Sequence, residues 1–124
     1  MDIMSEKEGE IEIDLSNLFE IAGGDNMFVA ALLGKMVKQL PISFADMERT
    51  CAEKDWPGLK SSAHKAKGTF AYLGLEDMRG RLRDIEHNAY EEVNLDEVPK
   101  QVEEALALGN EVLGQLNIEL SKLM

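Results

Sequence analysis

The sequence predicts an all-α protein, an antiparallel up-down four-helix bundle with a short N-terminal capping helix. Three observations lead to this fold class. Apolar residues recur at intervals of three and four over four long segments. Glycine, proline and capping residues separate these segments with short loops. No segment alternates every second residue with β-branched side chains, the pattern that is typical of strands.

The first expected helix is short and covers about residues 15–22. It ends at Gly23 and Gly24, because glycine adopts a positive φ at little cost. Residues 1–14 precede this helix and are expected to form a flexible acidic tail, to which the sequence assigns no function. The folded domain is therefore expected over residues 15–124.

A long helix is expected over about residues 26–53, with Asp25 as its N-cap. Pro41 lies inside this segment and leaves the carbonyl of Val37 without its usual donor. The sequence therefore predicts a kink at Pro41, with a break into two helices as the alternative. One face of the segment is apolar and comprises Phe28, Leu32, Met36, Leu40, Phe44, Met47 and Cys51.

Three further helices complete the expected bundle. The first covers about residues 55–72, with Asp55 as its N-cap and Pro57 tolerated in the first turn. The next covers about residues 76–90, and the last begins near Glu97. Because the connections are short, consecutive helices are expected to pack as antiparallel neighbours.

Composition limits the possible functions. A chain of 124 residues suits a single domain that buries roughly two-thirds of its unfolded surface. The formal charge of −11 argues against a nucleic-acid partner, since proteins that bind nucleic acids normally present a basic face. The N-terminus lacks the basic start and apolar stretch of a signal peptide. The longest apolar run, Met27–Leu33, is far below the roughly 20 residues that cross a bilayer, so no membrane partner is expected.

The cysteine content favours a cytoplasmic location. Cys51 is the only cysteine, so an internal disulfide is excluded, and a buried structural thiol is its expected role. Two histidines and one cysteine make a poor set of metal ligands, and neither a glycine-rich phosphate loop nor a nucleophile elbow is present. The sequence therefore gives little support to a self-contained enzyme.

Charge is distributed unevenly along the chain. Residues 60–83 contain six basic and two acidic side chains and carry +4, whereas the other residues carry −15. A basic patch is therefore expected on an acidic protein. Solvated helix faces often carry such charges. Considered alone, the patch could therefore be a solvated surface without a binding role.

His64 lies inside this basic stretch and is expected to face water. At about 100° per residue, the apolar side of its helix is centred about 140° away from His64. That apolar side comprises Leu59, Ala63, Ala66, Phe70 and Leu73. The side that carries His64 instead has small side chains and lysines, namely Pro57, Lys60, Ser61, Lys67, Gly68 and Ala71. A core histidine is therefore a poor explanation.

These neighbours suit phosphoryl chemistry. An exposed neutral imidazole is a nitrogen nucleophile near neutral pH. Lys67 lies one turn from His64 and is expected to reach a phosphoryl group attached to the ring. Gly68 leaves room for phosphoryl oxygens and for the backbone of another protein. Glycine inside a helix costs about 1 kcal/mol relative to alanine, so a compensating role is expected.

The stretch AHKAKGTFAYLG, residues 63–74, resembles the signature of histidine-containing phosphotransfer (HPt) domains. In that signature an alanine-histidine pair is followed by lysine-glycine three and four places on, and then by leucine-glycine. Asp55-Trp56 and Leu82–Glu86 also fit, and the similar helix layout covers about residues 15–123. The chain departs from the family at Lys65-Ala66, where an apolar pair is frequent, and at Thr69-Phe70, where small residues are common. Phe70 falls on the apolar side and is expected to alter packing only.

The resemblance implies a phosphorelay intermediate of two-component signalling without kinase activity of its own. His64 would accept a phosphoryl group from the aspartate of one receiver domain and pass it to another. Lys67 would steady the phosphoryl group, and Gly68 would provide clearance. The implied partners are response-regulator receiver domains and a hybrid sensor kinase, and Mg²⁺ would come from the receiver, with no cofactor or metal in this chain.

The expected docking face is the strip around His64, formed by Lys60, Ser61, Lys65 and Ala71. Its lysines would tune the approach of the partner electrostatically, and the contact should be modest in area, as in transient signalling encounters. The chain is expected to act as a monomer.

The sequence is compatible with three other interpretations. His87 lies among Asp84, Glu86 and Glu91 and is interpreted as an ordinary surface histidine. The dimerisation helices of sensor kinases also carry an exposed histidine, but an acidic residue usually follows it, whereas Lys65 follows here. The remaining alternative is a non-phosphorylated helical adaptor that binds a signalling partner through the same face.

Overall fold

The computed structural model describes residues 13–124, and within them the chain is all-helical and has no strands. The predicted all-α class is therefore confirmed. Most of the predicted acidic tail, residues 1–12, lies outside the described residues. The last two residues of that segment belong to the fold. Ile13 packs partly buried against the core, and the Asp14 carboxylate accepts a hydrogen bond of 2.9 Å from the backbone N–H of Ser16.

The first two described helices are α2, Ser16–Ile21, and α3, Asn26–Ala52. Gly23 and Gly24 link them with φ angles of +65° and +83°, so both have the left-handed backbone expected of this turn. The Asp25 carboxylate caps α3 by accepting hydrogen bonds from the backbone N–H groups of Met27 and Phe28.

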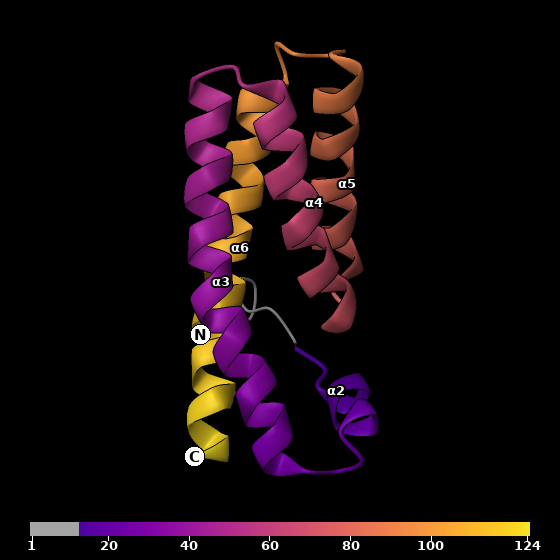
Figure 1. Ribbon diagram of the computed structural model, residues 1–124, viewed down its shortest axis with the longest axis vertical. Coiled ribbons are helices and arrows are strands. Elements are labelled where there is room, and N and C mark those ends of the chain that lie inside the picture. Colours follow the sequence, from indigo (N-terminus) through magenta and orange to yellow (C-terminus); the bar gives the residue numbers. More distant parts are fainter. Residues whose placement is uncertain (1–12) are drawn as a thin grey trace, which may run out of the picture.

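Pro41 lies within a single continuous helix, so the predicted alternative of two separate helices is wrong. Figure 1 shows that the ribbon of α3 changes direction along its length, as a proline inside a helix is expected to cause. Packing explains why the helix does not break, because buried residues lie on both sides of the proline, namely Val29, Leu33, Leu40, Phe44, Met47 and Thr50.

The remaining helices are α4, Trp56–Tyr72, α5, Glu76–Glu91, and α6, Val98–Leu123. Both ends of α4 and α5, and the start of α6, lie within two residues of the predicted positions. The Asp55 carboxylate accepts a hydrogen bond of 3.1 Å from the N–H of Gly58, as expected of an N-cap. Gly74 has a φ of +70° in the turn that leads from α4 to α5.

Each long helix packs against its neighbours in the chain, and α3 also packs against α6. The short helix α2 contacts α3, and the Asn17 side chain donates a hydrogen bond of 3.4 Å to the carbonyl of Tyr72 at the end of α4. Figure 1 accordingly shows α2 beside the N-terminal half of α3, beyond the lower end of α4. As a result, α2 and the N-terminal half of α3 lie beside the exposed side of α4.

The core receives side chains from every described helix. Phe70 of α4 is fully buried and stacks on Phe44 of α3, with the ring centroids 6.5 Å apart. The predicted packing role of Phe70 is therefore confirmed. Gly109 of α6 lies against the same ring, since a Cβ at this position would come within 2.6 Å of Phe44 Cζ. Close helix contact at this level of the bundle thus depends on a glycine.

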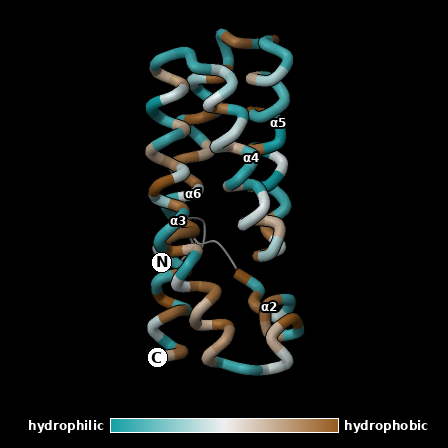
Figure 2. The backbone as a smooth tube through the Cα atoms, viewed as in Figure 1, coloured by the Kyte–Doolittle hydropathy of each residue, from teal (hydrophilic) through white to brown (hydrophobic). Residues whose placement is uncertain are grey.

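Hydropathy differs between the helices. Figure 2 shows hydrophobic residues concentrated in α2 and the N-terminal half of α3, whereas α5 is mostly hydrophilic. By length and composition alone, α3 is the one helix in the described part of the chain that is long and apolar enough to cross a membrane. It packs against α4 and α6.

Candidate functional site

His64 projects from the exposed side of α4, as its helical spacing predicted. Its side chain is 64% exposed. The opposite side of the helix is buried at Leu59, Ala63, Ala66 and Phe70. These apolar contacts fix the rotation of α4 and thereby hold the imidazole outside the core.

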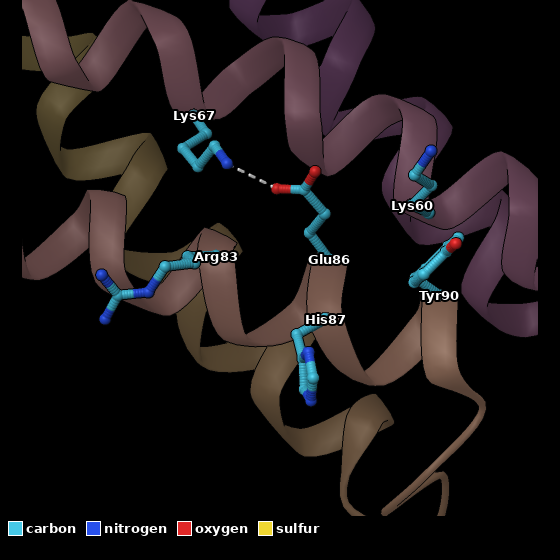
Figure 3. A pocket seen from close by; sticks show the side chains of 6 residues that line it. All are labelled: Lys60, Lys67, Arg83, Glu86, His87 and Tyr90. Carbon is cyan, nitrogen blue, oxygen red and sulfur yellow. Dashed lines mark hydrogen bonds and ion pairs between the residues drawn. The ribbon is translucent and has the colours of Figure 1, made fainter.

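A carboxylate from the neighbouring helix connects the side chains of His64 and Lys67 on α4. Glu86 of α5 places Oε2 2.7 Å from Nδ1 of His64 and Oε1 2.7 Å from Nζ of Lys67. Figure 3 shows Glu86 reaching across from α5 to Lys67 of α4. The buried residues Leu82 and Ile85 seat α5 against the bundle, so the position of the carboxylate is set by core packing.

Glu86 is ionised at neutral pH. Partial burial by itself raises the pKa of Glu86, because a carboxylate loses hydration there. The hydrogen bonds from Lys67 and His64, together with the positive charges of these groups, outweigh burial and lower the pKa below its ordinary value. The bridge between the two helices is therefore a negative charge held between an ammonium and an imidazole.

This bridge determines which nitrogen of His64 is free to react. An ionised carboxylate only accepts hydrogen bonds, so Nδ1 of His64 is the donor in the 2.7 Å contact with Glu86. In a neutral imidazole the other nitrogen then carries the lone pair. Nε2 is therefore the nucleophilic atom, and the ring is held in that tautomer and orientation by α5.

Lys67 lies closer to the bundle than His64 does. Its side chain is 25% exposed, and its ammonium is bound to Glu86. Because Lys67 lies one turn after His64 on the same helix, its ammonium is near any group attached to the imidazole. The two side chains predicted to handle a phosphoryl group are thus brought together, and a third residue links them.

Gly68 lies one turn after His64 and is exposed. A Cβ at this position would meet no atom within 4 Å, so packing within the described part of the chain does not require glycine here. Gly114 of α6 is also exposed and has the same open surroundings, whereas Gly109 is needed for packing. The space above Gly68 is therefore available to another molecule.

The groove beside Gly68 is largely apolar and lies between α2, α3 and α4. Ile21 and Phe28 are 54% and 46% exposed on its walls, and Tyr72 is 54% exposed at the end of α4. Lys65 and Gly68 form its edge on the His64 side. This groove was not predicted from the sequence, because its walls come from three helices whose mutual rotation depends on tertiary packing.

The predicted docking residues separate onto two flanks of His64. Lys65 faces the apolar groove, whereas Lys60 lies on the opposite flank, toward α5. The ammonium of Lys60 is 5.3 Å from the centroid of the Tyr90 ring, a cation–π contact. Ser61 and Ala71 are exposed on α4, as predicted.

Glu86 is the residue of the candidate site that was not predicted from the sequence. The sequence placed it in a segment that fits the family and among the acids around His87, and did not connect it with His64. It is 22 residues from His64 along the chain and contacts it directly. The available signal was its position directly after the apolar residue Ile85, which places an acid at the edge of a buried helix face. Periodicity alone does not reveal which residue of α4 this acid meets.

The other reactive residues lie apart from this bridge. His87 is exposed, and Figure 3 shows its ring pointing away from the Lys67–Glu86 pair. Cys51 is partly buried, and burial raises the pKa of its thiol. Across residues 13–124, no three His, Cys, Asp or Glu side chains are grouped so that they could hold a metal ion.

Comparison with known proteins gives one match. A family model described as Hpt domain matches residues 31–123, a range that includes all of α4, α5 and α6. Searches of curated proteins and of solved structures each found no match. The matched range contains His64, Lys67, Gly68 and Glu86.

Proposed function

Because the chain belongs to the Hpt domain family, which acts in phosphotransfer in two-component signalling, we propose that it is a phosphorelay intermediate. His64 accepts a phosphoryl group from the aspartate of one receiver domain and passes it to the aspartate of another. The observation that carries this proposal is the exposed imidazole whose Nδ1 is bound by Glu86 at 2.7 Å, which leaves Nε2 free toward solvent.

The transfer proceeds by attack of the Nε2 lone pair on the phosphorus of the receiver's acyl phosphate. The bond from phosphorus to the aspartyl oxygen breaks, the aspartate leaves as a carboxylate, and a bond from phosphorus to Nε2 forms. The proton on Nδ1 stays in place throughout. Delivery to the second receiver is the same step in reverse, with the second aspartate as nucleophile.

Glu86 assists by stabilising the charge that the ring acquires. As Nε2 forms its bond to phosphorus, positive charge develops on the imidazole, and the carboxylate at Nδ1 lies next to it. The ammonium of Lys67 is positioned near the phosphoryl oxygens and steadies their negative charge. A loose phosphoryl transition state needs mainly such alignment and charge neutralisation.

The partner supplies what this chain lacks. We propose that the receiver domain contributes Mg²⁺ from its acidic pocket and that this chain is a phosphocarrier, without kinase activity of its own. The receiver docks over the exposed side of α4, where Lys60, Ser61, Lys65 and Ala71 surround His64. The apolar groove beside Gly68 extends this docking face onto α2 and α3.

We also propose a specific arrangement of the helices. The four long helices form an antiparallel up-down bundle with α2 as its cap, supported by the contacts between consecutive helices and between α3 and α6. We further propose that the chain acts as a cytoplasmic monomer that meets a hybrid sensor kinase and a response regulator in turn.

The test is a phosphotransfer assay against a panel of purified receiver domains that carry a radiolabelled phosphoryl group. We expect label on the wild-type chain and on His87→Gln, and none on His64→Gln. The label should be lost in acid and retained in base, as a phosphoramidate bond is. Label that persists on His64→Gln would disprove the proposal.

A second candidate function is a helical adaptor that binds a signalling partner with no phosphate involved. The apolar groove favours it, because exposed Ile21, Phe28 and Tyr72 suit a protein contact whether or not His64 reacts. The same assay separates the two functions. A receiver that binds the chain without transferring label supports the adaptor.

A further inference from the structure

A pocket between α4 and α5 lies on the flank of His64 opposite the apolar groove. Its lining residues are Lys60, Lys67, Arg83, Glu86, His87 and Tyr90. Figure 3 shows Lys60 and Lys67 coming from α4 and the other four residues from α5. Glu86 lies in the middle, with Lys60 and Tyr90 toward one end and Arg83 toward the other.

The positive charge of this pocket is not neutralised from within. Both carboxylate oxygens of Glu86 are already bound, one to His64 and the other to Lys67. Among residues 13–124, neither Lys60 nor Arg83 forms an ion pair. Every other arginine of this part of the chain does form one, namely Arg49, Arg79 and Arg81.

One of these two cations is held in place. The ammonium of Lys60 lies 5.3 Å from the centroid of the Tyr90 ring, and Lys60 as a whole is half-buried. Its position over the ring reduces the freedom that a lysine would lose on binding a partner. Arg83 is exposed, and its planar guanidinium suits a carboxylate.

The charge of the whole chain makes this pocket distinctive. Residues 60–83 carry +4, and the rest of the chain carries −15. Arg79 and Arg81 of this stretch are paired with carboxylates. An acidic protein that approaches the chain is therefore repelled by its net charge of −11 and attracted where cations without an ion pair in the described residues, such as Lys60 and Arg83, lie. Attraction at one place steers the encounter and fixes its orientation.

We propose that this pocket, which includes Lys60 of the docking face, extends that face onto α5 and binds carboxylate side chains on the receiver's surface outside its phosphoacceptor pocket. The inference rests on the proposed function. The apolar groove on one flank of His64 supplies buried contact area, and the basic pocket on the other flank sets the direction of approach. Lys60 and Arg83 thus act on partner selection and on the rate of association, not on the reacting imidazole.

The test compares Lys60→Gln/Arg83→Gln with Lys38→Gln/Lys100→Gln. Both double variants remove two positive charges, and Lys38 and Lys100 are exposed lysines on other helices with no ion pair in the described part of the chain. The first measurement uses phosphoramidate, which needs no partner. Its P–N bond breaks, a bond from phosphorus to Nε2 of His64 forms, and ammonia leaves. The phosphoramidate rate of each variant measures the reactivity of His64 itself, and the control variant should react within about twofold of wild type. The rate of transfer from a receiver is then divided by this rate for each variant, so that only the effect on association is compared.

The second measurement is the second-order rate constant for transfer from the receiver domain that labels the wild-type chain fastest in the panel. At low salt the pocket variant should be about tenfold slower than wild type and the control variant less than twofold slower, since steering acts on association. At about 0.5 M salt the three proteins should converge, because screening removes the attraction. Exchanging the two cations, Lys60→Arg/Arg83→Lys, should restore the wild-type rate.

Two results would overturn the inference. One is equal transfer rates for the pocket and control variants at low salt, and the other is a defect of the pocket variant that salt does not change. Failure of the proposed function looks different, because the wild-type chain would then take no label from any receiver.

Discussion

At the scale of single residues, the shared carboxylate of Glu86 fixes the tautomer and the orientation of an exposed histidine, as the proposed phosphotransfer requires. A free surface imidazole exchanges its proton between two nitrogens and rotates about its side-chain bonds. The contact of 2.7 Å between Nδ1 and Glu86 removes both freedoms. The contact of 2.7 Å with Lys67 keeps the carboxylate in place.

The residue-scale prediction concerns Glu86→Ala. Losing a hydrogen bond between charged groups costs about 1.5–3 kcal/mol, so the rate of phosphorylation of His64 by phosphoramidate should fall by roughly 10- to 100-fold. Glu86→Gln should lose less, because its amide oxygen still accepts from Nδ1. The measurement is the initial rate of labelling at neutral pH. A matched control is Glu91→Gln, an exposed acid on the same helix, which should react like wild type. An unchanged rate for Glu86→Ala would remove Glu86 from the mechanism.

The exposure of His64 was predictable, whereas its partner was not. Periodicity within one helix places the apolar residues of α4 inward, and the direction of His64 follows from that alone. The meeting of His64 with Glu86 depends on the relative rotation and height of two helices. These quantities depend on how the buried side chains of α4 and α5 interlock, which local patterns do not encode.

At the scale of helices, α4 carries the candidate site and also has a glycine, Gly68, at an exposed position in its interior. Gly68 makes no contact that requires it within the described part of the chain. The helix is nevertheless regular from Trp56 to Tyr72. Stability of the free protein therefore does not explain this glycine.

The helix-scale prediction is that Gly68→Ala stabilises the chain and impairs transfer. Alanine should raise the free energy of unfolding by about 0.5–1 kcal/mol, since it is the better helix former and meets no obstruction. Transfer from a receiver should nevertheless slow by about tenfold, because the added methyl group fills space that the partner needs. Thermal unfolding and the receiver transfer rate are the two measurements.

Gly114→Ala is the control for this prediction. It replaces an exposed helical glycine with the same open surroundings on α6, so it should stabilise the chain and leave transfer unchanged. If Gly68→Ala transfers as fast as Gly114→Ala, clearance for a partner is not the reason for the glycine.

Helix boundaries were the most predictable part of the fold. Asp25 and Asp55 cap their helices as expected, and Gly24 and Gly74 adopt positive φ in the turns. These signals are local and act within a few residues. The effect of Pro41 was less certain, since the choice between a bent helix and two helices depends on the core contacts of both halves of α3.

At the scale of the whole molecule, the bridge through Glu86 couples the packing of α4 and α5 to pH. The pKa of Glu86 is lower in the folded protein than its ordinary value, because the contributions of Lys67 and His64 exceed that of burial. A carboxyl group with a depressed pKa adds stability above its unfolded pKa and loses it as pH falls through the folded value.

We therefore expect the free energy of unfolding of wild type to exceed that of Glu86→Gln at neutral pH and the two to converge on acidification below the ordinary pKa of a glutamate. Denaturant unfolding across this pH range measures the difference. Glu91→Gln should track wild type at every pH, because Glu91 is exposed and has no ion pair in the described residues. A gap between wild type and Glu86→Gln that is constant with pH would contradict this account.

The position of His64 between an apolar flank and a basic flank bears on how phosphoryl groups would pass from one receiver to the next. If the chain acts as proposed, the apolar groove on one side of His64 and the basic pocket on the other would accommodate one receiver domain at a time and in one orientation. The receiver that donates the phosphoryl group and the receiver that accepts it would then compete for the same surface. The first would have to dissociate before the second binds. The overall rate of phosphoryl transfer would accordingly depend on the relative concentrations and residence times of the two receivers. A cell could therefore adjust signalling by changing how much of either receiver it makes.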